Sequence, residues 1–382
     1  MAGLYIHVPF CARRCIYCDF YSNTNMEYKE AYISALLREM EMRHDYLNGE
    51  VIKTIYFGGG TPSQLSPGDI EKIFNGIYRF FSISDNPEIT IETNPDDLSD
   101  SYLTSLKALP VNRLSIGIQS FIDSELLLLN RRHTAGEAID AVARCKEGGI
   151  ENISIDIMYA LPGQTAESWM YNIDKAIELD VSHISAYNLT YEEGTAIYKM
   201  LNRKEIESVD DDVCEQFFRI LTAKLAKAGF VHYETSNFAK YSTSYPDGRI
   251  SLHNSSYWNG TQYLGIGPSA HSYNGESRSW NVSSIFGYIN ALNNSSMEFF
   301  ETENLDVIAR YNDFIITRLR TMWGVSLSEL RRVFGEERER YFLDKSEPFL
   351  FLNKLKKQGD SVKVSHDGIF ISDAIMRELI AL

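Results

Sequence analysis

Three closely spaced cysteines stand near the start of the chain. Cys11, Cys15 and Cys18 form the pattern C-x3-C-x2-C, and the 382-residue chain contains five cysteines in all. Cysteine thiolates hold [4Fe–4S] cubes, and three thiolates leave one of the four irons without a protein ligand. S-adenosylmethionine (SAM) can chelate that iron through its amino and carboxylate groups, and the difficult chemistry then resides in the cofactor. The spacing therefore predicts a [4Fe–4S] cluster that binds SAM.

A structural zinc site is the alternative use of these cysteines, with His7 or Asp19 as the fourth ligand. Zinc sites usually pair C-x2-C with a second, distant pair of ligands. The two remaining cysteines, Cys145 and Cys214, stand alone at unrelated spacings. We therefore favour the cluster over zinc, and we expect Cys145 and Cys214 to be small buried side chains of helices.

Short apolar runs alternate with helical periodicity through the first half of the chain. We expect strands over residues 4–8, 51–57, 88–92, 113–119, 152–158 and 183–189. Between them we expect helices over residues 26–44, 67–81, 99–108, 136–147 and 166–179. This alternation predicts an α/β fold with a parallel sheet and right-handed crossovers. An open doubly wound sheet fits as well, but we favour a partial (β/α)6 TIM-like barrel, because polar residues end successive strands, where barrels build their sites.

The second half of the chain has a different pattern. A helix (213–228) and a strand (231–238) lead into a stretch rich in Ser, Asn, Gly and Tyr. Later helices followed by a short hairpin, with strands over 362–364 and 368–372, suggest a winged-helix-like α+β unit. We therefore expect a barrel domain (1–240), a polar loop region (241–300) and a C-terminal domain (301–382).

Composition and charge limit the classes of partner. The net charge of −15 argues against binding nucleic acid or an anionic membrane through a diffuse positive field. No apolar run approaches the roughly 20 residues of a membrane span, and the start lacks the layout of a signal peptide. Cysteines grouped in a metal-binding pattern suit a reducing compartment. We expect a cytoplasmic protein with no nucleic-acid partner and no membrane span.

Several motifs carry a family resemblance that runs nearly end to end. They are LYIHVPFC (4–11) leading into the cysteine triplet, GGGTP (58–62), IETNP (91–95), SIGIQSF (115–121), DIMYALPG (156–163) and HNSSYW (253–258). Together they resemble the radical SAM family of oxygen-independent coproporphyrinogen III oxidases and their relatives, the HemW heme chaperones. The resemblance implies a radical SAM barrel in which the cluster cleaves SAM to a 5′-deoxyadenosyl radical.

The resemblance also implies which residues bind SAM. Gly59, Gly60 and Thr61 are expected to bring backbone amides and a hydroxyl close to the ligand, although a tight turn is their simpler use. The other expected contacts are Glu92 to the ammonium or ribose, Gln119 and Asp156 to the ribose or adenine, Arg131 to the carboxylate, and Tyr5 and Tyr17 lining the adenosyl pocket.

Two features place the chain closer to the chaperones than to the oxidases. The oxidases have a fourth cysteine where this chain has Phe20, and they carry an extension ahead of the first strand, where this chain opens directly into LYIH. The HemW branch also has the H-N-x-x-Y-W motif. It implies that His253, on a polar loop separate from the cluster, contributes to heme binding, with Tyr257 and Trp258 stacking on the porphyrin. A His that bonds backbone beside core aromatics is the alternative, and His271 is a second candidate ligand.

Three functions remain open. We expect a heme chaperone that passes heme to acceptor proteins, respiratory enzymes among the candidates, with a separate reductant for the cluster. The second is an oxygen-independent coproporphyrinogen III oxidase of porphyrin biosynthesis, although we do not expect oxidase activity. The third is a non-catalytic metal-binding scaffold, which has no need of polar residues at strand ends.

Overall fold

The computed structural model describes residues 1–241 and 249–381. Its centre is six parallel strands that pair in sequence order. They are β1 (Ala2–Val8), β2 (Ile52–Gly59), β3 (Ile83–Thr93), β4 (Arg113–Gln119), β5 (Ile153–Tyr159) and β6 (His183–Asn188). All six predicted strands are present, and the predicted parallel sheet is confirmed.

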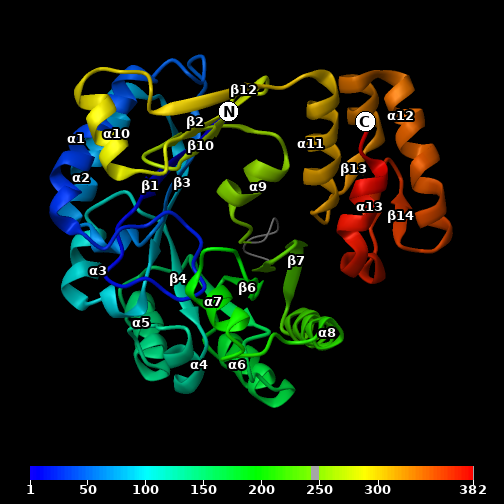
Figure 1. Cartoon of the computed structure of the whole chain (residues 1–382), viewed down its shortest axis with the longest axis horizontal. Helices are drawn as coiled ribbons and strands as arrows, with labels where there is room; N and C mark the ends of the chain where they lie inside the picture. The colour runs from blue at the N-terminus through cyan, green and yellow to red at the C-terminus, as the bar shows by residue number, and fades with distance from the viewer. Residues whose placement is uncertain (242–248, 382) are drawn as a thin grey trace.

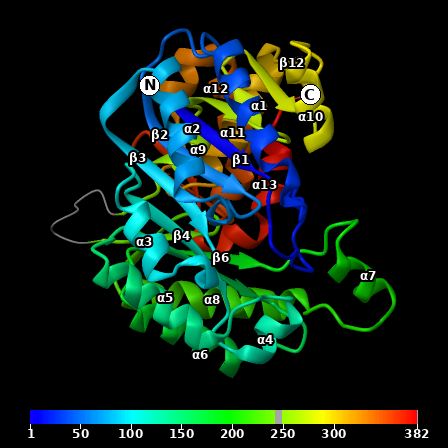
Figure 2. The same ribbon diagram turned by 90° about the vertical axis from the view of Figure 1, so that its left-hand side faces the viewer.

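Helices follow these strands and cover the outer face of the curved sheet (Figures 1 and 2). They are α1 (Lys29–Met42), α2 (Pro67–Phe80), α3 (Asp100–Leu106), α4 (Asp123–Leu128), α5 (Ala135–Glu147) and α6 (Ala166–Glu178), with 3-10 turns at Met26–Tyr28, Pro62–Gln64 and Pro95–Asp97. Capping boxes begin α2, α5 and α6 at Ser66, Thr134 and Thr165. The short helix α4 was not predicted.

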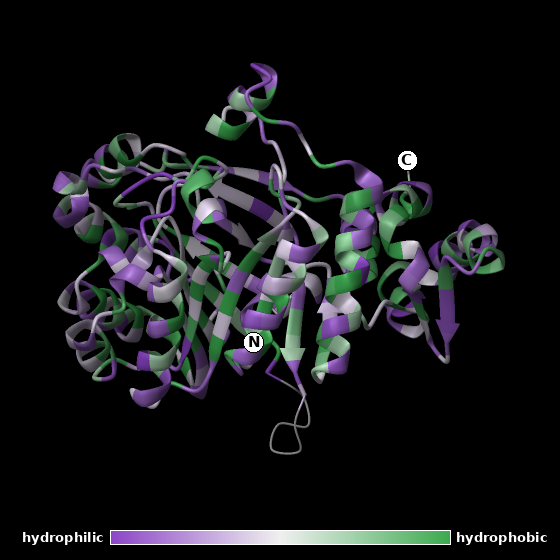
Figure 3. Ribbon diagram, turned by 90° about the horizontal axis from the view of Figure 1, so that it is seen from below, coloured by the Kyte–Doolittle hydropathy of each residue, from purple (hydrophilic) through white to green (hydrophobic). Residues whose placement is uncertain are grey.

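The hydrophobic core lies between the strands and these helices. Leu4, Ile6 and Val8 of β1 are fully buried on one face of the strand, because side chains alternate along a strand. Ile73 and Ile77 on the apolar stripe of α2 join the same core. Figure 3 shows hydrophobic residues along the central strands, with hydrophilic residues interspersed on the surrounding helices.

The sheet continues beyond the parallel strands at both edges, and its described part has 12 strands. At one edge are β8 (Asn237–Lys240) and β7 (Phe230–Glu234), preceded in the chain by α7 (Ala196–Asn202) and α8 (Asp211–Lys227). At the other edge β9 (Gln262–Ile266) pairs with β1, followed by β10 (His271–Tyr273), β11 (Ser277–Asn281) and β12 (Phe300–Asn304). The sheet is therefore an open arc, as expected for a partial barrel.

Two predictions in this region are wrong. The strand expected over 231–238 is two antiparallel strands, β7 and β8, joined by a tight turn without the Gly or Pro that marks such turns in a sequence. The polar loop region expected over 241–300 is largely regular structure, because α9 (Leu252–Trp258), β9 to β11 and α10 (Ile285–Asn293) lie within it. Residues 242–248 of that region lie outside the described residues. Helix α9 lies on the inner side of the arc and contacts β2 and α11 (Figure 1).

The C-terminal unit packs its own hydrophobic core beside the arc. It consists of α11 (Val307–Leu319), β13 (Val325–Ser326), α12 (Leu327–Phe351), β14 (Leu355–Gln358), β15 (Ser361–Val364), a 3-10 turn at His366–Ile371 and α13 (Ser372–Leu379). Gly335, at φ 86°, divides α12 into two helices, so the order of elements is that of a winged helix. The hairpin lies at β14 and β15, around Gly359 at φ 57°, and not over 362–372 as expected. No helix in the described ranges is long and apolar enough to cross a membrane.

Candidate functional site

A cavity of about 610 Å³ opens at the carboxyl ends of the parallel strands, within the size range of about 300–1,000 Å³ usual for ligand pockets. The loop after β1 and the ends of β2 to β6 contribute to its lining. Eleven of the residues expected to hold the cluster or SAM meet here: Cys11, Cys15, Tyr17, Cys18, Gly59, Gly60, Thr61, Glu92, Gln119, Arg131 and Asp156. Strands that run in parallel bring these distant residues together at one edge.

Hydrogen-bond donors contact two of the three cysteines. The Thr61 hydroxyl donates to the Cys11 sulfur at 3.4 Å, and Arg131 Nη1 donates to the Cys15 sulfur at 3.3 Å. Such donors stabilise a thiolate, which is the form that binds metal. Burial without a bound ligand acts in the opposite direction and raises the pKa of Cys18 to about 11. Cys145 is buried in α5 and Cys214 is half-buried in α8, and neither lines the cavity.

The segment Gly59 to Thr61 is held differently from our expectation. The amide of Gly59 donates to Glu92 Oε2 at 3.2 Å. The amides of Gly60 and Thr61 donate to the carbonyl oxygens of Val8 and Phe10, at 2.8 and 2.7 Å. These amides are therefore used inside the protein. All three residues nevertheless line the cavity, and a contact between this segment and SAM stays a prediction. Their hydrogen bonds hold the Glu92 side chain and the backbone before Cys11 in position.

Two buried carboxyl groups face the cavity from β3 and β5, the strands on either side of β4. Glu92 accepts from the Tyr56 hydroxyl at 2.8 Å, and burial raises its pKa to about 7. Asp156 accepts from the Ser115 hydroxyl at 3.4 Å, and burial raises its pKa to about 6. A positively charged ligand would offset this burial and stabilise the charged forms. The pair therefore suits a cationic or hydroxyl-rich ligand.

Arg131 and Gln119 complete the polar lining. Arg131 Nη2 donates to Asn94 Oδ1 and to the Gly117 carbonyl oxygen, each at 2.5 Å, while Nε has no partner among the described residues. Gln119 ends β4 at φ 73°, a conformation that costs a non-glycine residue free energy and is found more often at functional sites.

Two of the predicted site residues lie outside this cavity. Tyr5 lines a second cavity, where its hydroxyl contacts His7 Nδ1 at 3.1 Å, and its expected contact with the adenosyl group stays a prediction. His253 lies on α9, not on a loop, and is 1% exposed. Its ring nitrogens contact Thr54 Oγ1 and the Tyr257 hydroxyl, each at 2.8 Å, and burial lowers its pKa to about 3. The exposed loop ligand that we expected is therefore absent at His253.

Comparisons with known proteins place the chain in a family. The radical SAM superfamily matches residues 5–176. The heme chaperone HemW of Mycobacterium tuberculosis is 31% identical over 99% of this chain and 94% of its own length. The heme chaperone HemW of Bacillus subtilis is 32% identical over 98% of each chain. This chain belongs to the HemW family of radical SAM proteins.

A solved structure shares the fold of this HemW-family chain. The coproporphyrinogen III oxidase HemN of Escherichia coli matches it with a TM-score of 0.85, covering 100% of this chain and 90% of that one, at 21% identity. This likeness establishes the fold, a radical SAM α/β arc with a small C-terminal antiparallel sheet.

Radical SAM proteins imply a [4Fe–4S] cluster and SAM, and the cavity of this HemW-family chain fits both. Three thiols, a free guanidinium donor and two buried carboxyl groups converge on it. A single zinc ion needs ligands at about 2.0–2.3 Å from one point. In the described ranges, no three His, Cys, Asp or Glu side chains are grouped closely enough to hold one metal ion.

Several lining residues of the HemW-family cavity were not predicted. They include Asn94, Ser115, Tyr187, Asn188, Thr190, Glu192 and Ser236. Asn94 and Ser115 lie within motifs that we recognised but gave no role. Tyr187 and Asn188 end β6, so the rule that polar residues gather at strand ends would have found them. Ser236 lies in the unrecognised turn between β7 and β8.

Proposed function

We propose that this protein is a heme chaperone whose [4Fe–4S] cluster is held by Cys11, Cys15 and Cys18 and coordinated by SAM. The observation that carries the proposal is the meeting of the three cysteines with the strand-end polar residues in one cavity. It occurs in a chain that matches proteins named heme chaperone HemW over nearly its whole length. When bound, the cluster supplies an electron that can cleave SAM.

Different residues of the cavity contact different groups of the SAM molecule. The Glu92 carboxylate binds the ammonium or the ribose, and Asp156 and Gln119 bind the ribose or the adenine. Arg131 contacts the SAM carboxylate while it also holds Cys15 and Asn94. Tyr17, half-buried within the cysteine loop, covers the adenosyl group. Gly59, Gly60 and Thr61 position Glu92 and Cys11, and they border the ligand along one wall of the cavity.

Heme is the cargo in this proposal, and proteins that need heme, respiratory enzymes among them, accept it. A separate reductant supplies electrons to the cluster. The cysteines that would hold the cluster line the cavity at the strand ends. His253 contributes from within the core, through its hydrogen bond to the Tyr257 hydroxyl.

Anaerobic reconstitution followed by two parallel assays tests this function. The reconstituted protein is expected to bind hemin and to produce no protoporphyrinogen IX from coproporphyrinogen III in the presence of SAM and a reductant. The oxidases place a cysteine where this chain has Phe20, whose side chain is 65% exposed at the cavity rim. Turnover of coproporphyrinogen III without hemin binding would make the protein an oxidase instead. If the protein binds zinc instead of iron, binds no hemin and does not convert coproporphyrinogen III, the result would favour a non-catalytic metal-binding scaffold.

A further inference from the structure

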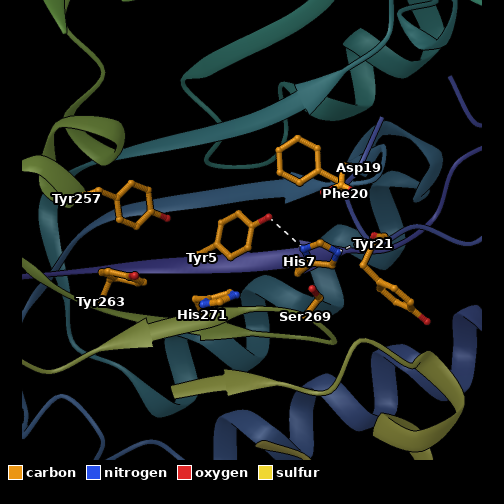
Figure 4. A pocket seen from close by; sticks show the side chains of 9 residues that line it. All are labelled: Tyr5, His7, Asp19, Phe20, Tyr21, Tyr257, Tyr263, Ser269 and His271. Carbon is orange, nitrogen blue, oxygen red and sulfur yellow. Dashed lines mark hydrogen bonds between the residues drawn. The ribbon is translucent and has the colours of Figure 1, made fainter. Parts of the chain in front are cut away.

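A second cavity, of about 290 Å³, lies beside β1 (Figure 4). Aromatic rings from four separate elements form its walls. Figure 4 shows Tyr5 of β1, Tyr257 of α9, Tyr263 of β9 and His271 of β10 gathered on one side, with Phe20 of the cysteine loop opposite. The residues that we assign to SAM binding do not line this second cavity, which shares only Asp19 and Phe20 with the first.

The histidines at this cavity differ in what their ring nitrogens already contact. His7 Nε2 donates to the Tyr21 carbonyl oxygen at 3.0 Å, so Nδ1 is left to accept from the Tyr5 hydroxyl. His253, behind Tyr257, also has both nitrogens occupied. The exposed His271 side chain makes no hydrogen bond with any residue in the described ranges. Its ring lies beside the Trp280 ring, with centroids 6.4 Å apart.

We propose that the iron of a heme-type tetrapyrrole binds in this second cavity with the His271 imidazole as its protein ligand. This inference rests on the proposed chaperone function and names the site at which the cargo is held. A neutral imidazole with a free nitrogen is a usual ligand of heme iron. Burial lowers the pKa of His271, which keeps the imidazole neutral at physiological pH.

The walls suit the flat faces of a macrocycle. Tyr257 and Tyr263 meet edge to face with centroids 4.7 Å apart, and the His253 ring packs against Tyr257 at 5.1 Å. This packing and the His253–Tyr257 hydrogen bond hold the Tyr257 ring in place, so we assign His253 a positioning role. At about 290 Å³ the cavity is smaller than the usual pocket for a drug-sized ligand. It would therefore receive only the part of the macrocycle that faces His271 and leave the rest accessible to an acceptor.

The two cavities share a wall. Asp19 and Phe20, which directly follow Cys18, line both of them. The tetrapyrrole site therefore adjoins the cluster site, and our expectation of a separate site is replaced by one of neighbouring sites. The side chain of Phe20 is 65% exposed at this shared wall, and a bound macrocycle would cover it.

Hemin titration of the full-length, reconstituted protein tests the assignment, with the Soret band and the iron–sulfur absorbance followed together. His271→Ala is expected to weaken hemin binding by at least the roughly 10–100-fold that loss of an outer-shell partner costs a metal site. The Soret band should lose its imidazole-ligated position while the iron–sulfur absorbance stays unchanged. His366→Ala, an exposed histidine of the C-terminal unit, is the control and should bind hemin as the wild type does. His253→Ala should weaken binding less and leave the Soret position unchanged.

A second variant distinguishes loss of the iron ligand from misfolding of the protein. In His271→Gly, free imidazole should restore the Soret position, because it can enter the space left by the side chain. An unchanged hemin titration in His271→Ala would overturn the assignment, and so would loss of the imidazole-ligated Soret band in His253→Ala alone. Either result would leave the chaperone function standing. A wild type that binds no hemin would overturn both.

Discussion

The guanidinium of Arg131 donates from Nη1 to the sulfur of Cys15 at 3.3 Å, across 116 residues of chain. One side chain thus joins the loop after β1 to the segment after β4, and it places a positive charge beside one of the proposed cluster ligands. The same guanidinium reaches Asn94 and the Gly117 carbonyl oxygen, so its position is fixed from three sides.

We expect Arg131→Met to lower the reduction potential of the reconstituted cluster, because hydrogen bonds and positive charge at the sulfurs favour the reduced state. A hydrogen bond to a charged group contributes at least about 1.4 kcal/mol. For a one-electron reduction, that free energy corresponds to a change in potential of about 59 mV, so we expect a shift on the order of 50 mV. A redox titration followed by electron paramagnetic resonance measures it. Arg132→Met is the control, because Arg132 pairs with Asp96 and Asp97 and not with a cysteine. Equal potentials in the wild type and Arg131→Met would contradict a ligand role for Cys15.

Alanine at Cys11, Cys15 and Cys18 together is expected to abolish the brown absorbance and the binding of about four irons per chain, since the three thiolates are the proposed ligands of a four-iron cube. Iron and acid-labile sulfide analysis checks this after reconstitution. Cys145→Ser and Cys214→Ser are the matched controls, because both side chains lie outside the cavity. Full iron content in the triple variant would contradict the assignment of these three cysteines as the cluster ligands.

Glu92 should make the stability of the ligand-free protein depend on pH. Its folded pKa of about 7 lies above the ordinary value of 4.5, so the folded state binds the proton more tightly than the unfolded state. The resulting stability is fully present below pH 4.5, declines as pH rises toward 7, and is lost above it. The decline is at most about 3 kcal/mol, at about 1.4 kcal/mol for each pKa unit.

Denaturant unfolding between pH 4.5 and 8 measures this decline, and Glu92→Gln should flatten it because glutamine does not titrate. The control is Glu301→Gln, an exposed residue of β12 that should leave the profile as it is. Identical profiles for the wild type and Glu92→Gln would mean that Glu92 is charged in the folded protein at neutral pH.

Gly59→Ala is expected to destabilise the protein and reduce cluster loading. Gly59 has φ 106°, where a side chain is strained, and a Cβ atom there would lie 2.5 Å from His7 Cε1. The backbone strain alone costs about 1–3 kcal/mol. Thermal unfolding and iron content measure the two effects. Gly136→Ala, at the start of α5 with open space around it, should be neutral or slightly stabilising. A fully loaded, stable Gly59→Ala protein would contradict the positioning role of this turn.

Local periodicity predicted the parallel half of the fold closely. The strand expected over 113–119 has those bounds in the structure, because Leu114, Ile116 and Ile118 alternate along it and are fully buried in the core. The same rules failed for β14, whose exposed LKKQ segment has no strand periodicity, and for the β7–β8 turn. In both places the strand exists because a partner strand pairs with it, and a single sequence does not display its partner.

The sequence by itself determined the cysteine triplet and the polar residues at the strand ends, because each belongs to a short motif whose chemistry is local. The tertiary structure alone decided which of these residues are accessible. His253 has the residue type of a heme ligand, yet Thr54, 199 residues away, occupies one of its nitrogens, and α9 packs it against β2. His271 has the same chemistry and remains exposed. Burial depends on contacts between segments far apart in the chain, so residue type alone could not separate the two histidines.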